Sequence, residues 1–302
     1  MTTPRRLHVS TENSAFQVLE SLVSNRVKRH RSRTFVLEGV QPITQALAHG
    51  WPFDAIIYES GAPLSEWATD VVARASAPVR YEMTPELLAR LSGKTDASEL
   101  LALVRMREES FNRIAVHAGL LVAVMDRPGN PGNLGTLIRS CDALGADGLV
   151  VTGHAVDVYD PATITASRGS LFALPVVQAA SHAEVLQWVA TIRQQLGSCR
   201  LVGADESADT DLAACDFTAP TVLVFGNETH GLSRAYRDAC DAVVRIPMRG
   251  SATSLNVSAA ASIAIYEVVR QRTGVRPQLD HAGGDHAGGL TPSDPSSITP
   301  GV

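Results

Sequence analysis

The sequence predicts an α/β protein with two domains. Continuous apolar runs, such as residues 120–125 and 221–225, alternate with helical segments in the second half of the chain, a pattern typical of strands buried on both faces of a parallel sheet. A smaller alternation of helix-like and strand-like segments fills residues 12–105. At 302 residues and 45% hydrophobic, the chain can bury the cores of two such domains.

The order of the patterns divides the chain into five segments. We expect a flexible N-terminus (1–11), a small α/β module (12–105), a linker (106–117), a larger α/β domain (118–272) and a disordered tail (273–302).

Local patterns locate the elements of both domains. In the module we expect strands at 34–39, 55–58 and 79–82, and helices at 42–49 and 84–91. In the larger domain we expect strands at 120–125, 148–151, 200–204, 221–225 and 242–246. Thr84 followed by Pro85 is typical of a helix start. The tail is rich in Gly, Pro, Ser and Asp, with too little apolar surface to offset the entropy of ordering.

Composition limits the class of protein. No run of about 18 apolar residues and no apolar stretch after the basic N-terminus is present, so we expect a soluble, cytoplasmic protein with no membrane segment. The cysteines stand far apart, and no Cys-x-x-Cys pair or His cluster at ligand spacing lies in the folded region, so we expect no metal site. They are Cys141, Cys199, Cys215 and Cys240, which we interpret as scattered buried thiols.

The charges are unevenly distributed. The net charge of −5 argues weakly against nucleic-acid binding. Residues 1–33, however, hold seven basic side chains against two acidic ones. A local excess of this kind can contact phosphates, although a solvated helix face explains the charge pattern equally well.

The first of three glycine-rich corners in the larger domain spans residues 126–139. Prolines and glycines at 128–132 predict a tight loop directly after an apolar strand. Asn133 stands where a helix should begin, as its N-cap, and Arg139 follows within two helical turns. In open α/β sheets, ligands bind at the carboxyl ends of strands, where such loops lie.

The second corner follows the most apolar strand of the chain. Gly226 and Gly231 bracket Glu228 and allow close backbone approaches that a Cβ would block. Glu228 is therefore a candidate partner for a cation or a ligand hydroxyl, with a solvated turn acid as the alternative.

The third corner spans residues 246–261 and leads into a helix rich in small residues. Ser254 and Asn256 stand near the N-terminus of that helix, where they can cap it or face a ligand.

Together, these corners resemble the three motifs of the SpoU/TrmH family of RNA ribose methyltransferases, within the SPOUT superfamily. The resemblance covers residues 118–270 most strongly and includes the piece 160–175. The matching residues are Asn133, Gly135 and Arg139 in the first corner; Gly226, Asn227, Glu228 and Gly231 in the second; and Ile246, Pro247, Met248, Ser254, Leu255, Asn256, Val257 and Ser258 in the third.

The resemblance implies a SPOUT domain in which the C-terminal segment forms a deep trefoil knot, and a homodimer with the active site near its interface. It implies S-adenosylmethionine as the cofactor. The residues expected around it are Leu223, Phe225, Gly226, Asn227, Gly231, Ile246, Met248, Ser254 and Leu255. The residues expected in catalysis are Arg139, Asn133, Glu228, Ser254 and Asn256.

The resemblance assigns Arg139 to activation of the ribose 2′-hydroxyl. A guanidinium gives up its proton reluctantly, so positioning of a phosphate or alkoxide is the rival role. We expect Glu228 to fix this guanidinium, and Asn133, Ser254 and Asn256 to orient the ribose and cofactor.

The N-terminal module resembles the substrate-binding domain of some family members, which is similar to a small RNA-binding ribosomal protein. Its presence favours 23S rRNA over tRNA as substrate. The residues expected to contact RNA are Arg26, Lys28, Arg29 and Arg168. Two rivals are a non-catalytic RNA-binding or ribosome assembly factor and a dinucleotide oxidoreductase, although no Gly-x-Gly-x-x-Gly follows any expected strand.

Overall fold

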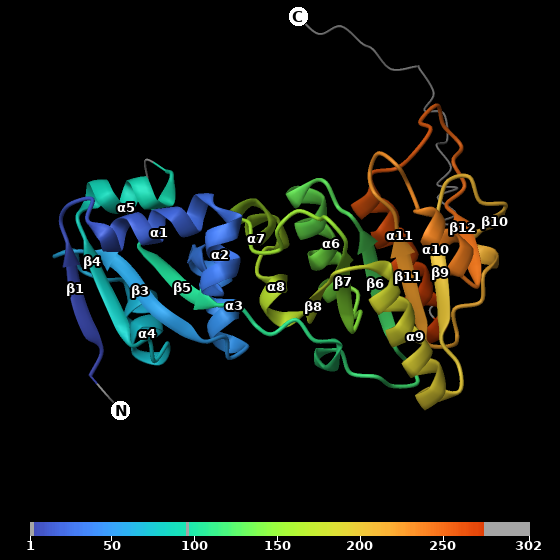
Figure 1. Ribbon diagram of the computed structural model, residues 1–302, viewed down its shortest axis with the longest axis horizontal. Coiled ribbons are helices and arrows are strands. Elements are labelled where there is room, and N and C mark those ends of the chain that lie inside the picture. Colours follow the sequence, from blue (N-terminus) through green and yellow to red (C-terminus); the bar gives the residue numbers. More distant parts are fainter. Residues whose placement is uncertain (1–2, 95–96, 275–302) are drawn as a thin grey trace, which may run out of the picture.

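The computed structural model describes residues 3–94 and 97–274, which form two sheets side by side with helices packed around and between them (Figure 1). The tail expected at 273–302 lies outside the described residues from position 275 onward. No helix in the described part of the chain is long and apolar enough to cross a membrane.

The N-terminal sheet has five strands. In spatial order they are β1 (Arg5–Val9), β4 (Val79–Met83), β3 (Phe53–Glu59), β5 (Leu100–Arg105) and β2 (Thr34–Glu38). The helices of this module are α1 (Ser14–Ser24), α2 (Arg26–Ser32), α3 (Val40–Ala48), α4 (Glu66–Arg74) and α5 (Pro85–Ser92). β5 lies between β2 and β3 and is antiparallel to both, while β3, β4 and β1 run parallel.

One expectation for this module was wrong, and one strand was missed. The N-terminus is not flexible over its whole length, because β1 pairs with β4 from Arg5 to Val9 and Val9 is buried. The backbone hydrogen bonds of this pairing and the burial of Val9 offset the entropy of ordering the segment. The sequence analysis also missed β5, whose apolar run ends in the charged stretch that we interpreted as the start of the linker.

The C-terminal sheet has seven strands, all parallel. In spatial order they are β10 (Thr210–Asp211), β12 (Ala242–Arg245), β9 (Arg200–Ala204), β11 (Thr221–Phe225), β6 (Leu121–Asp126), β7 (Gly148–Thr152) and β8 (Val176–Ala179). The helices are α6 (Pro131–Ala143), α7 (Pro161–Ser167), α8 (Ser170–Ala173), α9 (His182–Leu196), α10 (Arg234–Ala239) and α11 (Val257–Thr273), with short 3-10 turns η1 (Phe111–Arg113) and η2 (Leu212–Ala214). The five expected strands are present, and the sequence analysis missed β8 and β10.

Strand β11 shows how both faces of this sheet are buried. Leu223 and Phe225 pack into the hydrophobic cluster that contains α6 and α11, whereas Val222 and Val224 pack into the cluster that contains α9. The continuous apolar run follows from this burial on two faces. The sheet is thus a middle layer, and its carboxyl ends are free to carry loops.

Helix α6 packs unusually closely on α7, because Gly135 has no side chain. A Cβ at Gly135 would lie 2.4 Å from the carbonyl oxygen of Thr163 and 2.6 Å from the Cβ of Ala166. Glycine inside a helix normally costs stability relative to alanine. Here it permits the contact between α6 and α7.

We predict that Gly135→Ala lowers the free energy of unfolding by about 1–3 kcal/mol, because the overpacking penalty exceeds the gain of about 0.5–1 kcal/mol in helix propensity. Urea denaturation measures the difference. Thr136→Ala, at the exposed next position, is the matched control and should keep wild-type stability. A Gly135→Ala variant as stable as wild type would contradict the close packing.

Candidate active site

The three glycine-rich corners meet at one cavity of about 750 Å³ beside the carboxyl ends of β9, β11 and β12. Eleven residues predicted from the sequence line it. They are Asn133, Phe225, Gly226, Asn227, Glu228, Gly231, Ile246, Met248, Ser254, Leu255 and Asn256. Segments that are more than 100 residues apart in sequence therefore form one site.

Glu228 holds the first corner against the second. Its carboxylate accepts hydrogen bonds from the backbone N–H of Gly129 (2.9 Å) and Asn130 (3.2 Å) and from Nδ2 of Asn133 (3.1 Å). Partial burial opposes ionisation, but these hydrogen bonds outweigh it and lower the pKa of Glu228. The carboxylate is thus the acceptor that orders residues 129–133.

Asn133 continues this chain of contacts to the third corner. Its Oδ1 accepts a hydrogen bond of 2.9 Å from Nδ2 of Asn256. Asn256 is the N-cap of α11, and its Oδ1 accepts from the backbone N–H of Ser258. The expectation that Asn133 caps its helix was wrong, because Asn130 is the N-cap of α6 and Asn133 lies in its first turn.

The second corner is a closed turn with its backbone facing the cavity. Asn227 and Gly231 exchange backbone hydrogen bonds of 3.0 and 2.8 Å, and Gly231 has φ of 63°. A Cβ on Gly226 would lie 2.0 Å from the carbonyl carbon of Gly231. The side chain of Asn227 bonds the carbonyl oxygen of Arg127 (2.7 Å) and the backbone of Thr229, which fixes the turn to the first corner.

The sequence analysis missed a fourth segment of the cavity, directly after β9. Asp205 pairs with Arg237 at 2.5 Å and accepts two hydrogen bonds from Ser207. Glu206, beside them, is exposed and also lines the cavity. Burial opposes the ionisation of Asp205, but the bonds from Ser207 and Arg237 lower its pKa. The sequence did contain a signal for this segment, because Asp205 is a carboxylate that directly follows the buried strand β9.

Two predicted residues lie elsewhere. Leu223 is fully buried within β11 and belongs to the hydrophobic core, so it does not line the cavity. Arg139 is exposed on α6 and does not line the cavity either. The expected contact between Glu228 and the guanidinium of Arg139 is absent in residues 3–94 and 97–274, because Glu228 bonds the backbone of the first corner instead.

Three of the four residues predicted to contact RNA are accessible. Arg26 and Lys28 are exposed on α2, and Arg168 is exposed at the end of α7. Arg29 is not available to RNA, because its side chain is only 3% exposed and pairs with Asp157. The sequence could not separate Lys28 from Arg29, since the difference depends on where α2 packs.

Comparison with known proteins identifies the class. Residues 120–266 match the SpoU rRNA Methylase family, and residues 13–102 match the SpoU L30e-like domain. A 23S rRNA (uridine(2479)-2′-O)-methyltransferase of Streptomyces viridochromogenes is 46% identical over 271 residues, which cover 89% of this chain and 94% of that protein. The chain belongs to the SpoU rRNA methylase family.

Solved structures agree with this assignment. The SpoU methyltransferase AviRb from Streptomyces viridochromogenes, in complex with the cofactor AdoMet, superposes with a TM-score of 0.82 at 46% identity, covering 87% of this chain and 100% of that one. An AdoMet-bound rRNA methyltransferase from Sinorhizobium meliloti superposes with a TM-score of 0.78 at 26% identity, covering 88% of this chain and 98% of that one.

We predict that Glu228→Gln lowers the free energy of unfolding by about 1 kcal/mol, since one amide oxygen replaces two charged acceptors at an exposed position. The pKa of Glu228 is lowered from 4.5 in the folded protein, so the carboxylate stabilises fully above pH 4.5 and the effect disappears as pH falls through the lowered value.

The difference between wild type and variant should therefore be constant above pH 4.5 and shrink below it, as measured by denaturation across pH. Glu108→Gln, at an exposed position in the segment of the chain that connects β5 to η1, is the control and should show no such difference in stability. A stability difference between wild type and Glu228→Gln that grows towards acid pH would contradict the assignment.

Proposed function

We propose that this protein transfers a methyl group from S-adenosylmethionine to a ribose 2′-hydroxyl of 23S rRNA. The observation that carries this proposal is the convergence of the three corners on one cavity, joined by the bonds from Glu228 to Asn133 and from Asn133 to Asn256. The relative from Streptomyces viridochromogenes bears the name of such an enzyme and aligns with nearly the whole chain.

The cavity suits the cofactor in size and chemistry. Its volume falls in the range of sites for small ligands. Met248 and Leu255 offer partly exposed apolar surface, which an adenine ring can cover. Three carboxylates, Asp205, Glu206 and Glu228, line the cavity against one arginine, Arg237, and this excess of negative charge favours a cationic ligand. S-adenosylmethionine, when bound, supplies an electrophilic methyl group on a sulfonium.

The chain's own residues would organise the ribose. Asn133 and Asn256 are fixed to each other and to Glu228, so their positions at the cavity wall are set before a substrate arrives. Gly226 and Gly231 would present main-chain groups to the cofactor, and Ser254 would present its hydroxyl. Two roles are open to Arg139, removal of the hydroxyl proton or positioning of a neighbouring phosphate.

Within one chain, Arg139 does not line the cavity. In a homodimer, Arg139 would reach the active site at the interface. Arg139 lies on α6, next to Ser140, whose Oγ is 2.7 Å from Oγ of Ser262 on α11. α11 also exposes Ile263 (42%) and Tyr266 (50%), an apolar face suited to a second copy. We also propose that the C-terminal segment passes through a loop to form a deep trefoil knot, as the family resemblance implies.

The N-terminal module would recognise RNA, with Arg26 and Lys28 as its phosphate contacts and Arg168 of the C-terminal domain as a third. All three are exposed, as such contacts must be. The match of residues 13–102 to the SpoU L30e-like domain supports rRNA over tRNA as the substrate. The protein would act in the cytoplasm, where ribosomes are assembled.

Methylation of separated RNA pools tests the function. With methyl-labelled S-adenosylmethionine, we expect label in 23S rRNA and none in 16S rRNA or tRNA. A 2′-O-methyl blocks alkaline cleavage at that position, so the label should remain in an alkali-resistant dinucleotide. Label in tRNA alone would overturn the substrate, and cofactor binding without label in any pool would favour the non-catalytic assembly factor.

Arg139→Ala should lower turnover by about 100-fold or more while cofactor affinity, measured by calorimetry, stays unchanged, because Arg139 does not line the cavity within one chain and is proposed to act on the RNA. Arg139→Lys should also lose activity, since lysine lacks the two-pronged guanidinium. Arg234→Ala, at an exposed arginine on α10, is the control. Near-normal turnover of Arg139→Lys across pH would contradict both roles.

A further inference from the structure

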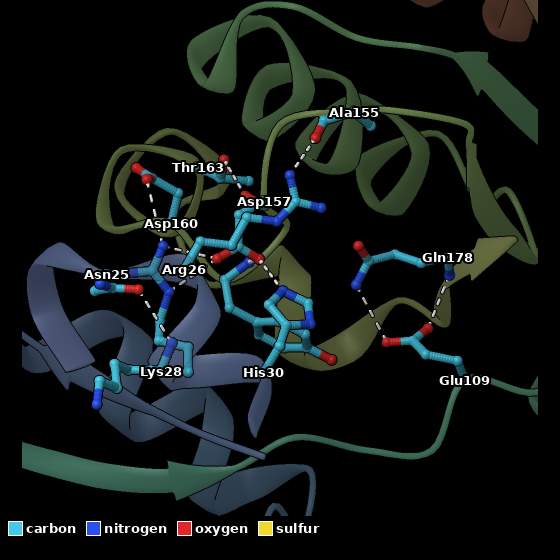
Figure 2. A network of polar contacts seen from close by, with 12 residues as sticks. Asn25, Arg26, Lys28, His30, Glu109, Ala155, Asp157, Asp160, Thr163 and Gln178 are labelled. Atoms are coloured by element: carbon cyan, nitrogen blue, oxygen red, sulfur yellow. Dashed lines mark hydrogen bonds and ion pairs between the residues drawn. The ribbon is translucent and has the colours of Figure 1, made fainter. Parts of the chain in front are cut away.

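A buried ion pair joins the N-terminal module to the C-terminal domain. Nη2 of Arg29 on α2 lies 2.7 Å from Oδ2 of Asp157, and Nε lies 2.8 Å from the same oxygen. Both side chains are 3% exposed. The two residues are 128 positions apart, and Figure 2 shows Asp157 beside His30 of α2, the residue after Arg29.

The remaining polar groups of this pair are also satisfied. Nη1 of Arg29 donates to the carbonyl oxygens of Leu22 (3.0 Å) and Val23 (2.8 Å) at the end of α1. Oδ1 of Asp157 contacts Nε2 of His30 (3.0 Å) and accepts from the backbone N–H of Tyr159 (3.1 Å). A buried pair adds little net stability compared with apolar residues, but a fully bonded one permits a single geometry.

The segment that carries Asp157 contacts the first corner of the active site. The backbone N–H of Val156 donates to the carbonyl oxygen of Pro128 (2.9 Å). The next residue, Gly129, is bonded to Glu228 at the cavity. Only a few fixed contacts therefore separate α2 from the cavity.

Aromatic packing makes the boundary rigid. Phe35 and Trp51 of the N-terminal module pack on Tyr159 and Phe172 of the C-terminal domain, with ring centroids 4.8 Å apart for Phe35 and Tyr159 and 5.2 Å apart for Trp51 and Phe172. Nε1 of Trp51 donates to the carbonyl oxygen of Phe172 (3.0 Å). Interfaces this apolar and buried do not behave as hinges.

The other face of α2 is free and basic. Lys28 is exposed directly beside the buried Arg29, and Arg31 and Val27 are exposed as well. Arg26 is exposed and also donates to the carbonyl oxygen of Ala155 (2.6 Å), in the segment that carries Asp157. The helix thus has one face suited to phosphates, while Arg26, Arg29 and His30 contact the C-terminal domain.

We propose that Arg29 and Asp157 are positioning residues that hold the RNA-binding face of α2 at a fixed distance from the cavity, and so determine which nucleotide of the bound RNA is methylated. This inference rests on the proposed function. Neither side chain touches RNA or cofactor. Their effect is on turnover and site choice, not on affinity.

Arg29→Met tests the pair, because it removes the charge and the donors but keeps the aliphatic stem. We expect turnover at saturating RNA to fall on the order of 100-fold, the effect of a misplacement near 1 Å, or methylation to spread to neighbouring nucleotides. The dissociation constants for RNA and for S-adenosylmethionine should stay within about twofold of wild type, since Arg29 contacts neither ligand.

Lys28→Ala, at the neighbouring exposed position, is the matched control for Arg29→Met. It should weaken RNA binding, while methylation stays at the same nucleotide. Asp54→Asn breaks the exposed pair with Arg105 at 2.6 Å inside the N-terminal module and should change none of these quantities. Asp157→Asn should reproduce Arg29→Met, and the double variant should lose no more than either single one, because the pair acts as a unit.

Wild-type turnover and site choice in Arg29→Met would overturn the inference. So would a loss of RNA or cofactor affinity in step with turnover, which marks a merely structural role. If Arg29→Met does not fold, Asp157→Asn carries the same test, since it keeps the shape of the side chain and the bond from Tyr159. Failure of the proposed function is distinct, because wild type itself would then label no RNA.

Discussion

The carboxylate of Glu228 is the contact on which the site depends. It accepts from two backbone N–H groups of the first corner and from Asn133, which in turn accepts from Asn256 at the start of α11. Loops at the ends of parallel strands lie beyond the hydrogen bonds of the sheet, so a single charged acceptor can order several of them. If the carboxylate is removed, the N–H groups of Gly129 and Asn130 and the side-chain amide of Asn133 lose their hydrogen-bond acceptor.

The same logic extends beyond the cavity. The first corner is bonded to Glu228 on one side and, through Pro128 and Val156, to the segment of Asp157 on the other. That segment receives Arg29 and His30 from α2. Fixed polar contacts and the aromatic boundary thus connect an exposed basic helix to the proposed methyl-transfer site, so one rigid body can bind RNA and present its ribose.

Much of this was accessible from the sequence for physical reasons. Two glycines that permit close backbone approach, with a carboxylate between them, can be recognised after an apolar run without knowledge of the tertiary structure. Gly226, Glu228 and Gly231 were therefore predictable. Burial of one basic side chain beside another was not, because Lys28 and Arg29 differ only in how α2 packs. The strand β1 was missed because its order comes from pairing with β4, 74 residues further along the chain. Arg139 remains a prediction because its proposed role depends on a second copy.

A crystal structure of the protein with S-adenosylhomocysteine tests the central claim most directly. We predict that the ligand lies between residues 226–231 and 246–257, with the bonds from Glu228 to Asn133 and from Asn133 to Asn256 intact. A ligand bound elsewhere on the molecule, or a cavity in which these bonds are broken and the first corner has moved away, would contradict the proposed site.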